Sequence, residues 1–301
     1  MTALIAALSI GGLALADSTD EPTSGALEPP TVVEVVRYAT RGDYTVETRF
    51  WIDVTRVADA EAVADRAMGV AVGDGTVTAQ YRVGKHKWVA SSLPLPLYYN
   101  PEGAGSQPSL GEAIQSGIAQ WNGVSGTTFS FTYAGTNSRG TGACADEIDA
   151  DGVNTIQYSN RLDFGVLGRT CTLFKSGPIL EFDMEIDTGT RWSTEGNTTR
   201  GSYDLASTVL HELGHAAGIS HPCEQSSGCT TAEKLSVMFP YLNDGDQRRT
   251  LTDDDRGALR EQYPGAPTPT PTEAPTPAPT PFVIPPYSRE FSAVALSLAR
   301  D

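Results

Sequence analysis

The sequence predicts an α+β fold, in which a twisted mixed β-sheet packs against three main helices. Short runs rich in β-branched and aromatic residues recur between residues 31 and 186, which is typical of strands. Longer segments with apolar side chains at helical spacing occupy residues 110–122 and 203–218, and a third begins at residue 252. The composition, 39% hydrophobic and 19% charged over 301 residues, excludes wholesale disorder and allows a sizeable core.

The N-terminal region, residues 17–87, contains its own predicted elements. Strand-like runs cover residues 31–38, 44–54 and 76–83, and a helix is expected at 58–68. This pattern fits either a pro-segment or an accessory α/β layer, and the sequence leaves both open.

The next region, residues 88–264, contains the three main helices. The second of them begins near Ser202 or Asp204, since either side chain could cap it. The third begins at Thr252, where Asp255 completes a capping box. The strands expected in this region are residues 95–99, 127–133, 155–159, 170–174 and 179–186.

The N-terminal residues favour export over the alternative, an apolar helix of the domain, and the C-terminal residues form a spacer and a tail. Residues 1–16 are apolar, carry no charged side chain and end in a small-x-small pattern, which predicts a signal peptide. Residues 265–286 form a Pro/Thr-rich linker, and residues 287–301 form a tail without an assigned role. We therefore expect a protein that is secreted or held at the cell surface.

Charge and hydropathy exclude two classes of partner. The formal net charge of −16 would repel a polyanion, so nucleic acid is not an expected partner. No apolar run is long enough to predict a membrane-spanning helix.

The four cysteines favour disulfides over a metal site. An even number of cysteines fits an oxidising compartment, and neither close pair has the spacing of a structural zinc site. Three pairings are possible, of which we favour the nearest-neighbour one, Cys144 with Cys171 and Cys223 with Cys229.

The most informative motif is His211-Glu212-x-x-His215-x-x-Gly218-x-x-His221. His211 and His215 are four residues apart, so both imidazoles project from one face of a helix. Gly218 can adopt a positive φ that ends the helix, and the turn would bring in His221 as a third zinc ligand. Three protein ligands leave a fourth position for water, as in catalytic zinc sites, and Glu212 lies beside that position.

This extended motif resembles the signature of the metzincin metallopeptidases. The sequence Ser-Val-Met-Phe-Pro around Met238 is similar to their Met-turn, and the segment from residue 251 to 263 is similar to the last helix of the matrixins, including bacterial-type members. The resemblance implies a metzincin-like catalytic domain over residues 88–264, with one catalytic Zn2+ and Met238 beneath the histidines.

The resemblance is incomplete at four places. Pro222 follows the third histidine, as in serralysins, and Pro240 stands where serralysins and astacins have a zinc-binding Tyr. His86 is the only histidine outside the motif, so the second, structural zinc of animal matrixins is not expected. Because no cysteine precedes Cys144, latency through a pro-segment cysteine is not expected either.

The family likeness also implies a mechanism. Glu212 would act as general base toward a zinc-activated water and later protonate the leaving amine. A protein or peptide substrate would lie extended against an edge strand near residues 166–174. Pro240 and Tyr241 would form one wall of the pocket beside the cleaved bond.

The sequence also allows a second metal site and two alternative functions. Asp183, Glu185 and Asp187 alternate on one strand, which makes them candidate Ca2+ ligands or a solvated acidic surface. The first rival function is a catalytically silent zinc-binding or adhesion module tethered by the Pro/Thr spacer. The second is a zinc peptidase outside the metzincins, whose third ligand would be a Glu from a later helix.

Overall fold

The computed structural model describes residues 30–41, 43–68, 86–145, 149–194, 196, 198–223 and 228–265. The predicted signal peptide, the strand expected at 76–83, the linker beyond residue 265 and the tail lie outside these residues. The described residues belong to one compact unit that ends at Ala266. No helix among them is long and apolar enough to cross a membrane.

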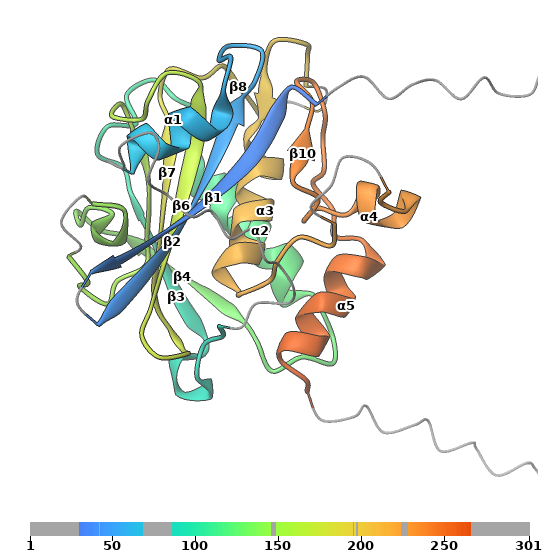
Figure 1. Cartoon of the computed structure of the whole chain (residues 1–301). Helices are drawn as coiled ribbons and strands as arrows, with labels where there is room; N and C mark the ends of the chain where they lie inside the picture. The colour runs from blue at the N-terminus through green and yellow to red at the C-terminus, as the bar shows by residue number, and fades with distance from the viewer. Residues whose placement is uncertain are drawn as a thin grey trace, which may run out of the picture. The chain divides into compact units, whose positions relative to one another are not determined.

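Eight strands form one mixed sheet in the order β10-β1-β2-β6-β7-β5-β3-β4 (Figure 1). Neighbours from β10 to β7 are antiparallel, and neighbours from β7 to β4 are parallel. The predicted α+β fold with a mixed sheet is therefore confirmed. The strands are β1 (Val32–Arg41), β2 (Tyr44–Asp53), β3 (Leu95–Asn100), β4 (Phe131–Thr136), β5 (Thr155–Ser159), β6 (Val166–Phe174), β7 (Ile179–Asp187) and β10 (Tyr241–Leu242), with β8 (Trp192–Ser193) and β9 (Tyr203–Asp204) as a separate parallel pair.

The three main helices form where the sequence predicts them. The Asp204 carboxylate accepts a hydrogen bond from the Ser207 N–H and caps the second of these helices. Thr252 and Asp255 form the expected capping box of the last one. The helices are α1 (Ala60–Ala67), α2 (Leu110–Asn122), α3 (Leu205–Ala216), α4 (Thr231–Leu235) and α5 (Asp253–Gln262), with short 3₁₀ turns at Ala90–Ser92 and Gly142–Cys144.

Helix α3 is held in the core by close packing against α2. The indole N–H of Trp121 donates to the Leu210 carbonyl over 3.0 Å, and the Trp121 side chain is fully buried. Gly117 of α2 faces Leu213 so closely that an added Cβ would lie 2.7 Å from its side chain. The two helices can approach in this way because a glycine stands at the crossing point.

The N-terminal hairpin β1–β2 extends the sheet along β6. Strand β2 pairs antiparallel with β6 from Thr45 opposite Phe174 to Ile52 opposite Val166. Strand β6 therefore has a neighbour on both sides, and the expected free edge near residues 166–174 is wrong for this arrangement of the chain. The reason is non-local, since the covering strand lies more than 100 residues earlier in the sequence.

The two faces of this hairpin have different roles, because side chains alternate along a strand. Val35, Phe50 and Ile52 pack with Val63 of α1 in a small apolar cluster. The opposite face presents Glu34, Arg49 and Trp51, and it points toward α3.

Two disulfides connect the nearest-neighbour cysteines. Cys144–Cys171 joins the turn at Gly142–Cys144 to β6, and Cys223–Cys229 closes the loop that follows His221.

Candidate metal centre

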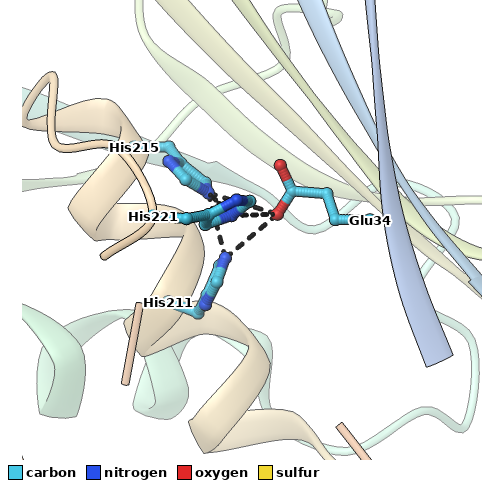
Figure 2. Close-up of side chains that lie close together, drawn as sticks. All are labelled: Glu34, His211, His215 and His221. Atoms are coloured by element: carbon cyan, nitrogen blue, oxygen red, sulfur yellow. Dashed lines mark hydrogen bonds and ion pairs between the residues drawn. The ribbon is translucent and has the colours of Figure 1, made fainter. Parts of the chain in front are cut away.

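Helix α3 and the turn after it bring three histidines together. His211 and His215 lie one turn apart on α3, and the helix ends at a glycine with positive φ, Gly218 at 79°. The Ile219 N–H returns to the Gly214 carbonyl over 3.0 Å, which closes the turn. The turn directs the His221 imidazole at the other two, so that the ligand atoms of the three rings lie within 4.8 Å of one another (Figure 2).

Backbone carbonyls orient two of the imidazoles. The Nδ1 atom of His211 lies 2.7 Å from the Val237 carbonyl oxygen, and that of His215 lies 2.8 Å from the Ile219 carbonyl oxygen. A carbonyl only accepts, so both Nδ1 atoms carry the hydrogen and both Nε2 atoms present a lone pair. Burial lowers the pKa of both rings, which favours the neutral imidazole that binds metals.

A fourth group, Glu34 of β1, meets the three histidines. Its Oε2 atom lies 3.1 Å from Nε2 of His211, 3.2 Å from that of His215 and 2.9 Å from that of His221 (Figure 2). Among the described residues, this is the only group of His, Cys, Asp and Glu side chains close enough to share a metal ion.

The four ligand atoms fit a tetrahedral zinc ion. Nε2 of His215 lies 2.9 Å from Nε2 of His211 and 3.2 Å from Nε2 of His221. A zinc ion with bonds of about 2.0–2.1 Å would separate its ligand atoms by roughly 3.3–3.4 Å. The Nε2 lone pairs of His211 and His215 and the carboxylate oxygen of Glu34 repel one another at such distances, and a cation at their centre would relieve that repulsion.

Sequence reasoning missed Glu34. A local signal exists, since Glu34 is a single carboxylate within the apolar run Val32–Val36. Burial opposes its charge, but positive charge on the histidine side and on Arg49 outweighs this and holds the pKa of Glu34 well below its usual range; a metal ion among neutral imidazoles would supply that positive charge. The group is therefore an ionised carboxylate with a fully buried side chain.

Glu212 follows His211 in the sequence, but its carboxylate contacts β6 and not the histidine cluster. Its carboxylate accepts a short hydrogen bond from the Thr170 hydroxyl of β6, and the residue is buried. Burial and the neighbouring Glu34 raise the pKa of Glu212 to about 8 in this arrangement. The structure thus places Glu212 between the histidine helix and β6, the strand expected to bind substrate.

Met238 lies directly under α3. A Cβ added to Gly214 would lie 2.2 Å from the Met238 sulfur and 2.9 Å from Trp121, so the methionine touches the helix between His211 and His215. Its side chain is buried, and its role as an apolar support beneath the imidazoles stays a prediction.

The loop that contains Met238 is attached to α5 through Asp255. The backbone N–H groups of Val237 and Met238 donate to the Asp255 carboxylate over 3.0 and 3.1 Å. Because the Val237 carbonyl also accepts the hydrogen of His211, Asp255 orients a candidate zinc ligand through the loop.

We expect Gly214→Ala to destabilise the protein by about 1–3 kcal/mol, because the new methyl group would overlap Met238 and Trp121. Gly257→Ala is the matched control: it lies in α5, no atom lies within 4 Å of the added Cβ, and the change should be neutral or stabilising by up to about 1 kcal/mol. Urea unfolding of both variants measures the difference. Equal effects at the two positions would contradict the close packing of Met238 on α3.

Pro240 and Tyr241, the expected pocket residues, do not line the cavity beside His221. That cavity has a volume of about 560 Å³ and is lined by Met238 and residues of α5. Tyr241 instead pairs with Val33 in the short ladder between β10 and β1. Pro240 is buried next to it, and the pocket role of both residues stays a prediction.

The three acidic side chains of β7 are occupied by protein partners. Asp183 accepts hydrogen bonds from two backbone N–H groups, and Glu185 pairs with Arg169 over 2.6 Å. Asp187 accepts a hydrogen bond from Thr190. These contacts account for the three carboxylates without an ion, and a Ca2+ site at them has no support in the described residues.

Comparison with known proteins gives a consistent set of relatives. A family model described as Matrixin matches residues 104–264. Matrix metalloproteinase-27 of Homo sapiens is 29% identical over 172 residues, which cover 57% of this chain and 29% of that protein, and the Tupaia belangeri protein of the same name is 28% identical over 173 residues, with the same coverage. Metalloendoproteinase 2-MMP of Arabidopsis thaliana is 28% identical over 108 residues, which cover 34% of this chain and 25% of that protein.

Among solved structures, this chain is similar to High choriolytic enzyme 1, a hatching-enzyme zinc protease from Oryzias latipes. The sequence identity is 14% and the TM-score is 0.29, and the match covers 58% of this chain and 92% of the other.

Proposed function

Because this chain belongs to the matrixin family, we propose that it is a zinc-dependent endopeptidase. The observation that supports the proposal most is the convergence of three imidazoles, with the Glu212 carboxylate beside them. The chain spans only 29% of the length of the first curated relatives, so the proposal concerns the domain that it shares with them.

In this proposal His211, His215 and His221 hold the ion. When bound, zinc would lower the pKa of a water molecule toward neutrality and polarise the carbonyl of the peptide to be cleaved. Glu212 then takes the proton from the water and passes it to the leaving amine. Thr170 orients Glu212 through its hydroxyl, and Met238 supports the imidazoles from below.

The substrate in this proposal is a protein or peptide in extended conformation. It would add to β6 by main-chain hydrogen bonds once β2 has left that strand, with Pro240 and Tyr241 beside the cleaved bond. We also propose secretion, which the apolar residues 1–16 and the two disulfides support. Calcium is not part of the proposal.

One observation favours a second candidate, the silent zinc-binding module. Glu34 would be a fourth protein ligand beside the three histidines, and four protein ligands are typical of structural rather than catalytic zinc. The two candidates differ in whether peptide hydrolysis can be obtained at all. The decisive assay measures zinc content and peptide hydrolysis on the full chain, before and after limited digestion with trypsin, which can cut after Arg82, Lys85 and Lys87.

For an endopeptidase we expect one zinc per chain and hydrolysis that a chelator abolishes and added zinc restores. Zinc binding without hydrolysis of any unfolded substrate, before or after digestion, would instead support the silent module. Absence of zinc would contradict both candidates.

We expect His221→Ala to weaken zinc binding by more than about 100-fold, because even the loss of a residue that only orients a ligand costs about 10–100-fold. His86→Ala is the control: His86 stacks on Phe174, outside the cluster, and should leave zinc binding unchanged. Competition with a coloured chelator measures the affinity of both variants. Unchanged affinity in His221→Ala would favour the alternative with a Glu as third ligand.

A further inference from the structure

We propose that the N-terminal hairpin β1–β2 keeps this enzyme latent, with Glu34 as the fourth ligand of the zinc and β2 in the place of the substrate. The inference rests on the proposed function. It assigns a role to a region that carries neither a cysteine nor any part of the zinc motif.

The first support is the position of Glu34. Among the described residues of the hairpin, Glu34 is the carboxylate that reaches the histidines. A single oxygen, Oε2, lies 2.9–3.2 Å from all three Nε2 atoms. A water molecule bound to the zinc would need that same position, because three imidazoles and Oε2 complete a tetrahedron. The hairpin and the catalytic water are therefore mutually exclusive.

The second support is that the hairpin itself orients Glu34. The Arg49 guanidinium of β2 donates to Oε1 over 2.7 Å, and the Trp51 indole N–H reaches Oε2 over 3.2 Å. Arg49 is in turn held by Glu47 over 2.7 Å. With Oε1 occupied by Arg49, the other oxygen is directed at the histidines.

The third support is where the hairpin lies in the sheet. It fills the space between β6, the strand expected to bind substrate, and β10, the segment that follows the Met238 loop. Strand β2 pairs with the backbone of β6 along one edge, and β1 pairs with β10, where Val33 lies opposite Tyr241. An extended peptide that adds to β6 would need the same backbone groups, so it cannot bind until β2 leaves.

These contacts divide latency into two separable parts. Glu34 closes the zinc to small ligands, and β2 closes β6 to peptides. Replacing Glu34 should therefore open the metal while peptide hydrolysis stays blocked, and removal of the hairpin should relieve both.

The test uses the full chain with Co2+ in place of zinc, so that the visible spectrum reports the ligands of the metal. Acetohydroxamate is the probe for a free coordination position. In the wild type we expect no spectral change on its addition, and in Glu34→Gln a clear shift. Asp43→Asn is the matched control: it removes a carboxylate from the turn of the same hairpin, where Asp43 pairs only with the exposed Lys175, and should behave as wild type.

A second readout uses zinc itself. We expect 1,10-phenanthroline to remove zinc from Glu34→Gln at least about tenfold faster than from the wild type or from Asp43→Asn. Glu34→Asp keeps the charge but shortens the side chain, so it should also expose the metal. After trypsin digestion, with loss of the hairpin verified by mass spectrometry, the wild type and Glu34→Gln should hydrolyse peptides at equal rates.

The proposal is overturned if the wild-type spectrum shifts with acetohydroxamate as much as that of Glu34→Gln. It is also overturned if neither Glu34 variant retains the metal, since Glu34 would then be a permanent structural ligand. A digested protein that binds acetohydroxamate but cleaves no peptide would leave the closure intact and refute the peptidase function. Failure of the full chain to bind any metal would overturn both the closure, which places Glu34 on the metal, and the peptidase function.

Discussion

Replacing Glu212 by Gln is expected to lower peptide hydrolysis by about 10²–10⁴-fold while zinc content stays at the wild-type level. The amide keeps the size of the side chain and can still accept the hydrogen bond from Thr170. It cannot take a proton from water, and Glu212 is not one of the residues that hold the ion. The loss should therefore appear in turnover, with little change in zinc affinity.

The measurement compares wild type and Glu212→Gln after identical digestion with trypsin, with zinc determined on the same samples. Glu112→Gln on the exposed side of α2 is the control, since it makes the same chemical change outside the histidine cluster and should leave turnover unchanged. Full activity in Glu212→Gln would remove the general base from the mechanism. Loss of zinc together with activity would make Glu212 a ligand.

Asp255→Ala is expected to cost more than about 3 kcal/mol of folding free energy. The buried carboxylate accepts hydrogen bonds from the Ser236 hydroxyl, from the backbone of Val237 and Met238, and from Thr252. Each donor left unpaired in the interior costs about 1–3 kcal/mol. Since several donors lose their partner at once, this should be among the most destabilising single substitutions in the chain.

Zinc affinity should fall as well, by about 10–100-fold, because the Val237 carbonyl that orients His211 belongs to the loop that Asp255 holds. Asp254→Ala is the matched control: this neighbour on α5 is exposed, and its loss should cost less than about 1 kcal/mol. Urea unfolding and zinc titration of both variants give the two quantities. Similar stability of the two variants would show that Asp255 does not secure the loop.

Local patterns account for the parts of the site that lie close together in the sequence. The spacing of His211, His215 and Gly218 specifies a helix with two imidazoles on one face and a turn after it, and the structure has both. The helix at 110–122 and the capping box at Thr252 follow in the same way from side-chain periodicity and capping chemistry. Such features depend on neighbours within a few residues, so a single sequence contains the information that specifies them.

The contacts that cover the histidines and β6 join residues that are far apart in the sequence. Glu34 meets His211 across 177 residues of chain, and β2 covers β6 although the family resemblance implied a free edge there. Periodicity shows that residues 31–38 form a strand, but it does not show which strand will be its neighbour or which ligand its one carboxylate will approach. The sequence alone therefore determined the three clustered histidines and the helix that presents two of them. Only the tertiary structure decided what faces them, because strand pairing is selected by packing over the whole domain.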